Sequence, residues 1–479
     1  MERLHRRRLR RPSHRWWIWS GGVAFLVILA LAYLTWTGLK AKSELMAAKK
    51  DATAVRTAVK AGDNDAAQSA LKRFSRHAAK AHDDTSGPLW KVSSWVPYVG
   101  TTPKALRLAA EAADDIGQQA QQTLSDTGGK QLLARLAPHD GAIDLGALQR
   151  VQGSVGRLAG LVERDAAELG DINTGHLLWS ARRPYRDFYS QLVQLRGDIA
   201  TANRAVQVMP TALGAERPQN YLVMFANNAE IRSWGGIPGS WALVRASHGK
   251  LSIIRQGSSR DFGPYTQPVT PLSATEQAIF GPHPALFFQD TGITPDFPRT
   301  AAFATAMWKT RYDEHLDGVF ETDTVTLKYL LGAIGPVKVP GVALTEHNAV
   351  DELLNRTYLR IPDPDQQDVF FAAVARQIFT KVTHGTKSPL DLVDVFAKSV
   401  REGRTHLNLA DPALQKQIDG STIAGHLSFD PNGSPELGLY VNDVTASKMS
   451  YYLSTNLHTT SVSCRGGTQT LRSTATFSE

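Results

Sequence analysis

The sequence predicts an α+β protein that contains a mixed α/β domain, and three observations support this. A basic N-terminus precedes a long uncharged apolar run, helical periodicity then continues to about residue 209, and strand-like runs interrupted by helical segments follow from about residue 218. The expected parts are a basic cytoplasmic tail (1–15), a transmembrane anchor (16–39), a helical stalk or bundle (40–210), a mixed-sheet domain (211–425) and a β-rich segment (426–479).

The N-terminal segment has the pattern of a membrane anchor. Residues 1–15 carry seven arginines and one acidic residue, and the next 24 residues, 16–39, carry no charge. A hydrocarbon core of about 30 Å requires roughly 20 apolar helical residues. The positive-inside rule places the N-terminus in the cytoplasm and the chain after Lys40 outside it. A cleaved signal peptide is the competing interpretation, although its apolar region is usually only about 7–15 residues long.

Charge and cysteine content narrow the function classes. The chain has 53 basic and 45 acidic residues, and the part after residue 15 has 46 and 44, so the high net charge belongs mainly to the tail. The tail arginines can also contact anionic lipid headgroups. No basic stripe with interleaved aromatic residues follows, so nucleic acid is not an expected partner. The single cysteine, Cys464, excludes an internal disulfide framework and a cysteine-based zinc site.

The stalk is expected to be helical almost throughout, with a break at Gly62-Asp63-Asn64-Asp65. Apolar residues recur at alternating three- and four-residue steps, which places them on one face of a helix that continues the anchor: Leu45, Ala48, Ala52, Val55 and Val59. Further helices are predicted over residues 66–81, 104–124, 144–169 and 184–208. Their alanine-rich faces of mixed charge indicate a spacer bundle without chemistry.

The mixed domain is expected to begin with a strand at Tyr221–Phe225 and a hairpin of Trp241–Arg245 and Leu251–Arg255. An extended segment is predicted at 337–344, and helices are predicted at 322–334, 349–354, 365–380 and 390–400. Strands are predicted at 437–442, 450–455, 459–464 and 468–477. Because no element follows the last strand, we expect the sequence to be a C-terminal truncation of a longer chain.

Common enzyme signatures are absent from the sequence, including the phosphate-binding loop, the nucleophile elbow and the H-E-x-x-H zinc helix. The loop 227–240 is unusual because it places Asn228, Glu230, Arg232 and three glycines between two predicted strands. Glycines allow backbone N–H groups to approach an anion closely. The alternative is a structural turn in which Glu230 and Arg232 pair with the backbone or with each other.

A second candidate site lies at the end of the second hairpin strand, where Arg260 precedes Asp261. An arginine can bind a phosphate through two parallel hydrogen bonds, and an aspartate can supply an oxygen ligand to a divalent cation. An ordinary surface ion pair is the alternative.

Residues about 217–455 resemble the bacterial family called domain of unknown function 4012. The resemblance is carried by NYLVMFANNAEIRSWGGIPGSWALVRASHGKLSIIR, PDFPRTAAFATAMW, DGVFETDTVTLKYLLGAIGPVKVPG and LGLYVNDVTASKMSYYL. The family has no established activity. Its members are commonly long and membrane-anchored, which agrees with the predicted anchor.

The same domain is similar, more remotely, to the LytR-CpsA-Psr phosphotransferases, which transfer glycopolymers from polyprenyl-pyrophosphate carriers to the cell wall. YLVMF, the ANNAEIRSWGG loop and a hairpin ending in Ser259-Arg260-Asp261 follow the order of that family's opening pattern. The similarity implies a pyrophosphate site formed by Arg232, Arg260, Arg356 and Arg360. It also implies that Asp261, with Glu230, holds Mg²⁺.

One feature of that family's pattern is missing. The aspartate of its R-x-D-T motif has no counterpart, because Gly239-Ser240 stands just before the hairpin strand. The expected function is therefore a non-catalytic binding or scaffold module for envelope glycopolymer or cell-wall polymer. The alternative is a Mg²⁺-dependent phosphotransferase that acts on polyprenyl-pyrophosphate-linked glycopolymer, with Arg260, Asp261 and Arg232 as catalytic residues.

Overall fold

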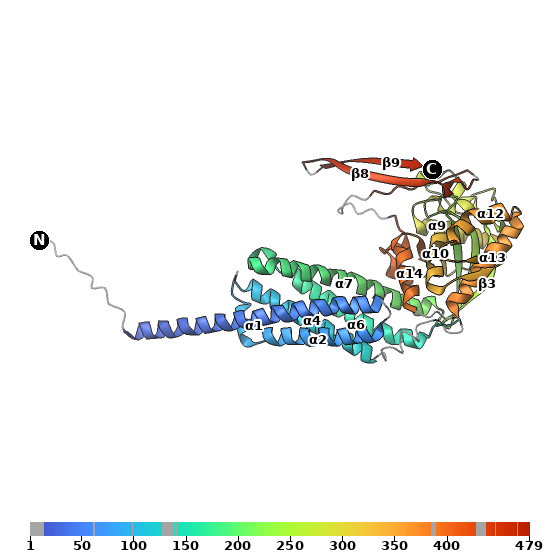
Figure 1. The fold of residues 1–479 in the computed structure, drawn as a ribbon. Helices are drawn as coiled ribbons and strands as arrows, with labels where there is room; N and C mark the ends of the chain where they lie inside the picture. The colour runs from blue at the N-terminus through green and yellow to red at the C-terminus, as the bar shows by residue number, and fades with distance from the viewer. Residues whose placement is uncertain are drawn as a thin grey trace. The chain divides into compact units, whose positions relative to one another are not determined.

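The computed structural model describes residues 14–60, 63–97, 99–126, 138, 141–384, 389–427, 437–445, 447–466 and 468–479. The chain forms two compact units. The helical unit contains the described residues up to 126 together with 151–203, and the sheet unit contains 141–150 and the described residues from 204 onward. The α+β class is confirmed (Figure 1).

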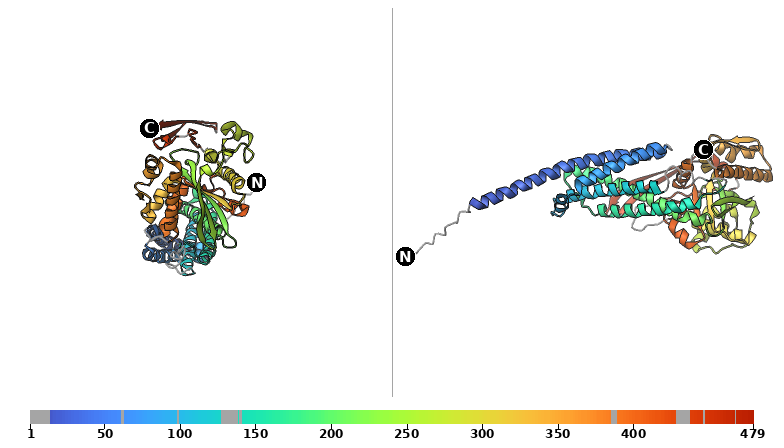
Figure 2. Two further views of the ribbon diagram at one scale, coloured as in Figure 1. Left: turned by 90° about the vertical axis from the view of Figure 1, so that its right-hand side faces the viewer. Right: turned by 90° about the horizontal axis from the view of Figure 1, so that it is seen from below.

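The helical unit consists of long helices that run alternately in opposite directions (Figure 2). They are α1 (His14–Lys60), α2 (Asn64–Thr85), α4 (Thr101–Asp126), α6 (Leu145–Gly170) and α7 (Trp179–Ala212), the last two continuing into the sheet unit. The short helix α3 (Pro88–Ser93) lies between α2 and α4. All the helices predicted between residues 40 and 209 are confirmed. As predicted, one helix, α1, runs without a break from the expected anchor into the stalk.

Small residues allow close packing within this unit. Buried alanines at 105, 109 and 112 of α4 pack with Val162 and Leu169 of α6. The hydroxyl of Ser75 on α2 donates to the carbonyl of Gly117 on α4 at 3.0 Å. A Cβ atom at Gly117 would lie 3.1 Å from the Ser75 Cα, so the crossing of α2 and α4 depends on this glycine.

In the part of the chain that the structure describes, no helix combines the length and the apolar character needed to cross a bilayer. Residues 1–13 of the predicted basic tail lie outside the described residues. The transmembrane segment 16–39 therefore stays a prediction.

The sheet unit is built on a mixed five-stranded sheet with the order β3-β2-β1-β4-β7. Its strands are β1 (Gln219–Asn227), β2 (Ile237–Ser247), β3 (Lys250–Ser258), β4 (Gly318–Asp323) and β7 (Thr405–Leu409). β1 and β4 are parallel, and the other neighbouring pairs are antiparallel. The predicted hairpin is confirmed, with a tight turn at His248 and Gly249, both of which have positive φ.

Helices cover both faces of this sheet. On one face, Leu222 and Val319 pack with Trp241 and with α9 (Phe297–Tyr312), including Trp308. On the other face, Phe225 packs against a cluster formed mainly by α10 (Thr324–Ile334) and α13 (Pro364–Thr383). Because side chains alternate along β1, Leu222 and Phe225 point into different cores.

Smaller elements complete the unit. They are α8 (Ala274–Phe280), β5 (Val337–Val339), β6 (Val342–Leu344), α11 (Ala349–Asp351), a π-helical turn (Glu352–Arg356), α12 (Thr357–Arg360), α14 (Pro389–Arg401), α15 (Pro412–Ile418), β8 (Ser454–Arg465) and β9 (Thr468–Ser478). The predicted helices at 322–334, 349–354, 365–380 and 390–400 are confirmed, except that 322–323 end β4 and 349–354 include part of the π-helical turn.

The C-terminal segment differs from the prediction in two places. Residues 437–442 form no strand, because Asn442 and Asp443 bond to the loop after β1 instead of to a neighbouring strand. Residues Met449–Tyr451 form a 3₁₀ turn, and β8 begins only at Ser454. The last two predicted strands are confirmed as the hairpin of β8 and β9.

Candidate functional site

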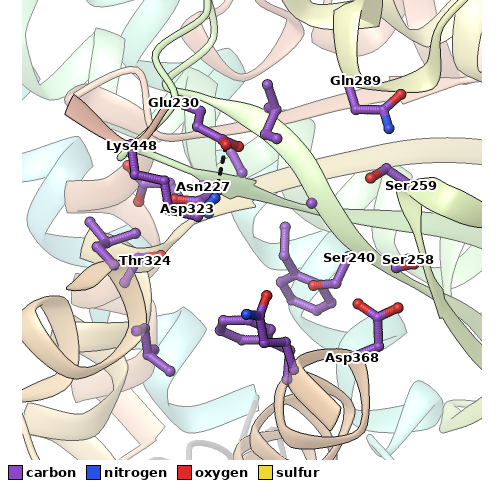
Figure 3. A pocket seen from close by; sticks show the side chains of 18 of the residues that line it. Asn227, Glu230, Ser240, Ser258, Ser259, Gln289, Asp323, Thr324, Asp368 and Lys448 are labelled. Atoms are coloured by element: carbon purple, nitrogen blue, oxygen red, sulfur yellow. Dashed lines mark hydrogen bonds and ion pairs between the residues drawn. The ribbon is translucent and has the colours of Figure 1, made fainter. Parts of the chain in front are cut away.

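A cavity of about 460 Å³ opens in the sheet unit where the parallel strands β1 and β4 end (Figure 3). The carboxyl ends of parallel strands are a common place for ligands because the chain diverges there. Its polar lining is Asn227, Glu230, Arg232, Ser240, Ser258, Ser259, Arg260, Gln289, Asp290, Asp323, Thr324, Gln367, Asp368, Thr445 and Lys448. Its larger apolar and aromatic lining residues are Phe225, Ile237, Phe287, Leu327, Leu353, Leu354, Tyr358, Phe371, Val374 and Val444.

The loop after β1 has its shape because backbone groups bond within it. The N–H of Gly235 donates to the carbonyl of Arg232 at 3.0 Å, and the N–H of Ile237 donates to Glu230 at 3.0 Å. A Cβ atom at Gly236 would lie 1.9 Å from the carbonyl oxygen of Asn227. The glycines therefore permit close backbone packing, and the Gly235 N–H group is already used inside the loop.

Asp323 organises the end of β4, and no local pattern in the sequence identifies it as a site residue. Asp323 is buried, with only 2% of the residue exposed. Its carboxylate accepts hydrogen bonds from the N–H and the hydroxyl of Thr326, at 2.8 and 3.0 Å. It also accepts from Asn228 at 3.1 Å and from Arg404 at 2.8 Å. This carboxylate caps α10 and ties the loop after β1 to the residue before β7.

Arg232 lies at the cavity but is used to hold the surrounding segments together. The residue is 6% exposed, and its guanidinium donates to the Asp290 carboxylate at 2.8 and 3.1 Å. It also donates to the carbonyls of Ile231 and Asp443. The loop after β1, the segment before α9 and the C-terminal segment meet at this one side chain.

Arg260 also lines the cavity and is half exposed. It pairs with Asp365 at 2.8 Å and with Asp368 at 2.5 Å, and these hydrogen bonds raise the pKa of the Arg260 guanidinium. Asp261 points elsewhere, because its carboxylate accepts the Ser258 N–H at 2.8 Å and closes a short 3₁₀ turn. Arg260 therefore forms ion pairs with two aspartates of α13 and not with the neighbouring Asp261.

Arg356 and Arg360 do not belong to the residues that line the cavity. Arg356 pairs with Asp351 at 2.5 Å, and Arg360 pairs with Glu352 at 2.9 Å. Of the four arginines implied by the phosphotransferase similarity, the cavity therefore brings together Arg232 and Arg260.

Glu230 and Lys448 form an ion pair of 2.8 Å at the rim, which Figure 3 shows beside Asn227 and Asp323. The Lys448 ammonium also lies 4.2 Å from the ring centre of Tyr358, whose hydroxyl accepts from Asn227 at 2.8 Å. Burial raises the pKa of Tyr358, so this hydroxyl stays protonated. Two oxygens here, Oε2 of Glu230 and Oδ1 of Asn228, are buried without a hydrogen-bond partner among the described residues.

Asp261 and Glu230, the Mg²⁺ ligands that the phosphotransferase similarity implies, do not form a metal site in this structure. Asp261 uses its carboxylate inside the 3₁₀ turn, and Glu230 is neutralised by Lys448. Among the residues that the structure describes, no group of three or more His, Cys, Asp and Glu side chains is arranged to hold a metal ion.

Fold and site together define an α+β protein with a ligand-sized cavity at the carboxyl ends of two parallel strands. Residues 216–358, which contain β1 to β4, α9 and α10, match the family described as "Protein of unknown function (DUF4012)". The chain therefore carries a domain of this family, and the resemblance seen in the sequence is confirmed. No curated protein and no solved structure matches the chain. The similarity to LytR-CpsA-Psr phosphotransferases stays a prediction.

Proposed function

We propose that this chain is a membrane-anchored, extracytoplasmic protein of the cell envelope whose sheet unit binds a glycopolymer without transforming it. The observation that carries this proposal is the charge balance of the cavity. Three cationic side chains line it, Arg232, Arg260 and Lys448, and each already has a carboxylate partner within 2.8 Å.

This balance favours a neutral polar ligand over a pyrophosphate. The lining contains four carboxylates against the three cations: Glu230, Asp290, Asp323 and Asp368. A pyrophosphate would have to displace carboxylates from Arg260 or Arg232 and would lie close to those it displaced. Like charges at short range oppose binding, so the gain of each new Arg–phosphate bond is offset.

Sugar hydroxyls suit the groups that remain free. A hydroxyl can donate to the unpartnered Oε2 of Glu230, and it can exchange hydrogen bonds with Ser240 and Gln289. The ring of Phe371 offers an apolar surface for the C–H face of a sugar. A volume of 460 Å³ also falls within the range of about 300–1,000 Å³ that is usual for ligand sites.

The anchor proposal rests on the sequence and on the outer part of α1. The uncharged run 16–39 follows seven arginines, and α1 continues through it to Lys60. Within the described side chains of this run, Ile28, Leu31, Trp36 and Leu39 are all more than half exposed. Apolar side chains exposed along one helix are stabilised when lipid covers them.

A calorimetric titration of the full chain in lipid nanodiscs tests the binding function. Neutral oligosaccharide fragments of cell-wall glycan should bind equally well with and without Mg²⁺. Glu230→Ala should weaken this binding by about tenfold, because one charge-assisted hydrogen bond is worth roughly 1.5–3 kcal/mol. Glu314→Ala is the matched control, since Glu314 pairs with Arg255 at 2.9 Å and is not a lining residue of the cavity.

The alternative function is a Mg²⁺-dependent phosphotransferase acting on a polyprenyl-pyrophosphate carrier. It is favoured by the presence of Arg232 and Arg260 at one cavity and by apolar lining residues, such as Leu353 and Val374, that suit a prenyl chain. Mg²⁺-dependent binding of a short-chain polyprenyl pyrophosphate in the same titration, with no heat from the oligosaccharides, would establish this alternative and contradict our proposal.

A further inference from the structure

The helical unit exposes an apolar surface at the end from which the N-terminal part of α1 emerges. Because the helices alternate in direction, the connections from α2 to α4 and from α6 to α7 both lie at this end (Figure 1). The indole N–H of Trp90 on α3 donates to the hydroxyl of Thr37 on α1 at 3.0 Å. The N–H of Leu178 donates to the hydroxyl of Thr102 at 2.9 Å, which brings the two connections together.

We call this the apolar end surface and define it by Val92, Trp95, Val99, Leu178 and Trp179. Their exposed fractions are 68%, 88%, 73%, 65% and 87%, in the same order. Two almost fully exposed tryptophans contribute little to the packing of the bundle. Soluble monomeric domains rarely leave apolar side chains gathered in this way, and such a surface usually marks a protein or membrane contact.

We propose that the apolar end surface is a second membrane contact, which enters the outer interface of the bilayer around the anchor. This inference rests on the proposed anchoring of residues 16–39. A helix rises 1.5 Å per residue, so the 24 residues span about 36 Å, whereas the hydrocarbon core is about 30 Å thick. The last residues of the run, including Trp36 and Thr37, therefore lie at headgroup depth.

The depth of the apolar end surface relative to the bilayer follows from the contacts between α3 and α1. Trp90 is bonded to Thr37, and a Cβ atom at Gly38 would lie 3.2 Å from the ring of Trp90. α3 is therefore held beside the headgroup-level turn of α1. The Lys40 ammonium lies 3.8 Å from the ring centre of Trp36, which marks the step from the apolar run to the charged stalk.

The chemistry of the surface also matches a lipid interface. Tryptophan is enriched at this depth because its ring is apolar while its N–H group can bond to water or headgroups. Lys91 and Arg183 are exposed next to the surface and can pair with lipid phosphates. The bilayer is favoured over a second copy of the chain because α3, which carries Val92, contacts Thr37 and Gly38 at the end of the predicted membrane segment. Two contacts, the anchor and this surface, would fix the tilt of the bundle.

Depth measurements on the full chain test the inference. The exposed Cys464 is replaced by Cys464→Ser, and single cysteines are introduced by Val99→Cys, Trp179→Cys, Ile28→Cys and Gln121→Cys, all at exposed positions. Each variant carries an environment-sensitive fluorophore in vesicles of phosphatidylcholine and phosphatidylglycerol. Quenching by aqueous iodide is compared with quenching by a lipid that bears a bromine at a shallow depth.

Iodide should quench the probes at 99 and 179 several-fold less than the probe at 121, which lies near the far end of α4. The brominated lipid should quench the probes at 99 and 179. Probe 28 reports the anchor independently. If probe 28 is shielded but probes 99 and 179 behave like probe 121, the inference is wrong and the anchor stands. If probe 28 is itself open to iodide, the anchor proposal fails. Shielding of 99 and 179 without lipid quenching would indicate a protein contact and would also overturn the inference.

Discussion

Arg232 and Arg260 line the same cavity in different environments. Arg232 is buried and bonded to Asp290 and to two carbonyls, whereas Arg260 is half exposed and pairs with two aspartates of α13. The sequence identified both arginines as site residues. It could not identify their partners, because Asp290 is 58 positions from Arg232 and Asp368 is 108 positions from Arg260. Local patterns carry no information on such pairings.

The two arginines should therefore differ strongly in their contribution to stability. Arg232→Ala leaves the Asp290 carboxylate without its cation in a buried place, so the free energy of unfolding should fall by about 3–5 kcal/mol. Arg260→Ala removes a largely solvated pair and should lower it by about 0–1 kcal/mol. Calorimetric melting of the full-length variants measures both values. Equal effects would show that Arg232 does not hold the surrounding segments together.

Glu321 makes the stability of the sheet unit depend on pH. It lies on β4 beside Met224, is 1% exposed, and neither of its carboxylate oxygens has a partner among the described residues. Burial, with a smaller effect of Asp323, raises the pKa of Glu321 well above 4.5. The folded chain therefore keeps a proton that the unfolded chain releases. Stability from this group is present below pH 4.5 and declines as the pH rises toward the raised folded pKa.

Glu321→Gln should remove that decline, because an amide of similar shape does not ionise. The melting temperature of the variant should then change less than that of the original chain between about pH 5 and pH 8. Glu314→Gln is the control, since Glu314 is partly exposed and paired with Arg255. An unchanged pH dependence in Glu321→Gln would assign the effect to another group.

Among the helices and strands, the sequence predicts those that have one buried face and one solvated face, because their apolar residues recur at a regular period. α2 and α4 have one buried face and one solvated face, so both were predicted. α9 was missed because Phe297, Ala301 and Met307 are buried around much of its circumference and leave only a weak periodic signal. The predicted strand at 437–442 was wrong because its apolar residues suggested a ladder, whereas Asn442 bonds to Ser233 from a distant loop.

The hairpin of β8 and β9 should be the least stable part of the sheet unit. Nearly all of its residues are exposed, and an isolated pair of strands is only marginally stable in water. Hydrogen exchange should therefore show rapid deuteration of Ser454–Ser478, while β1 and β4 in the centre of the five-stranded sheet exchange slowly. Protection of the hairpin equal to that of β1 would mean that another surface covers it.

For the whole molecule, the proposed anchor predicts on which side of a membrane each part of the chain lies. A reporter enzyme that is active only outside the cytoplasm should be active when fused after Leu169 and inactive when fused before Trp16. Replacing the tail arginines should weaken this orientation, because the distribution of Lys and Arg sets it. A mature protein released without its first 40 residues would instead support the signal-peptide interpretation.

The position of Lys448 has a consequence for the order of events during synthesis. Synthesis reaches the cavity wall that contains Val444, Thr445 and Lys448 long after it has passed the other lining residues. Until residue 448 has been synthesised and has reached the cavity, Glu230 lacks its Lys448 counter-ion and Arg232 lacks the Asp443 carbonyl. Domains generally fold from the N-terminus as the chain is produced. A chain synthesised only as far as α13 therefore holds an open cavity with unbalanced charges, and the cavity is completed when the segment around Lys448 joins the sheet unit.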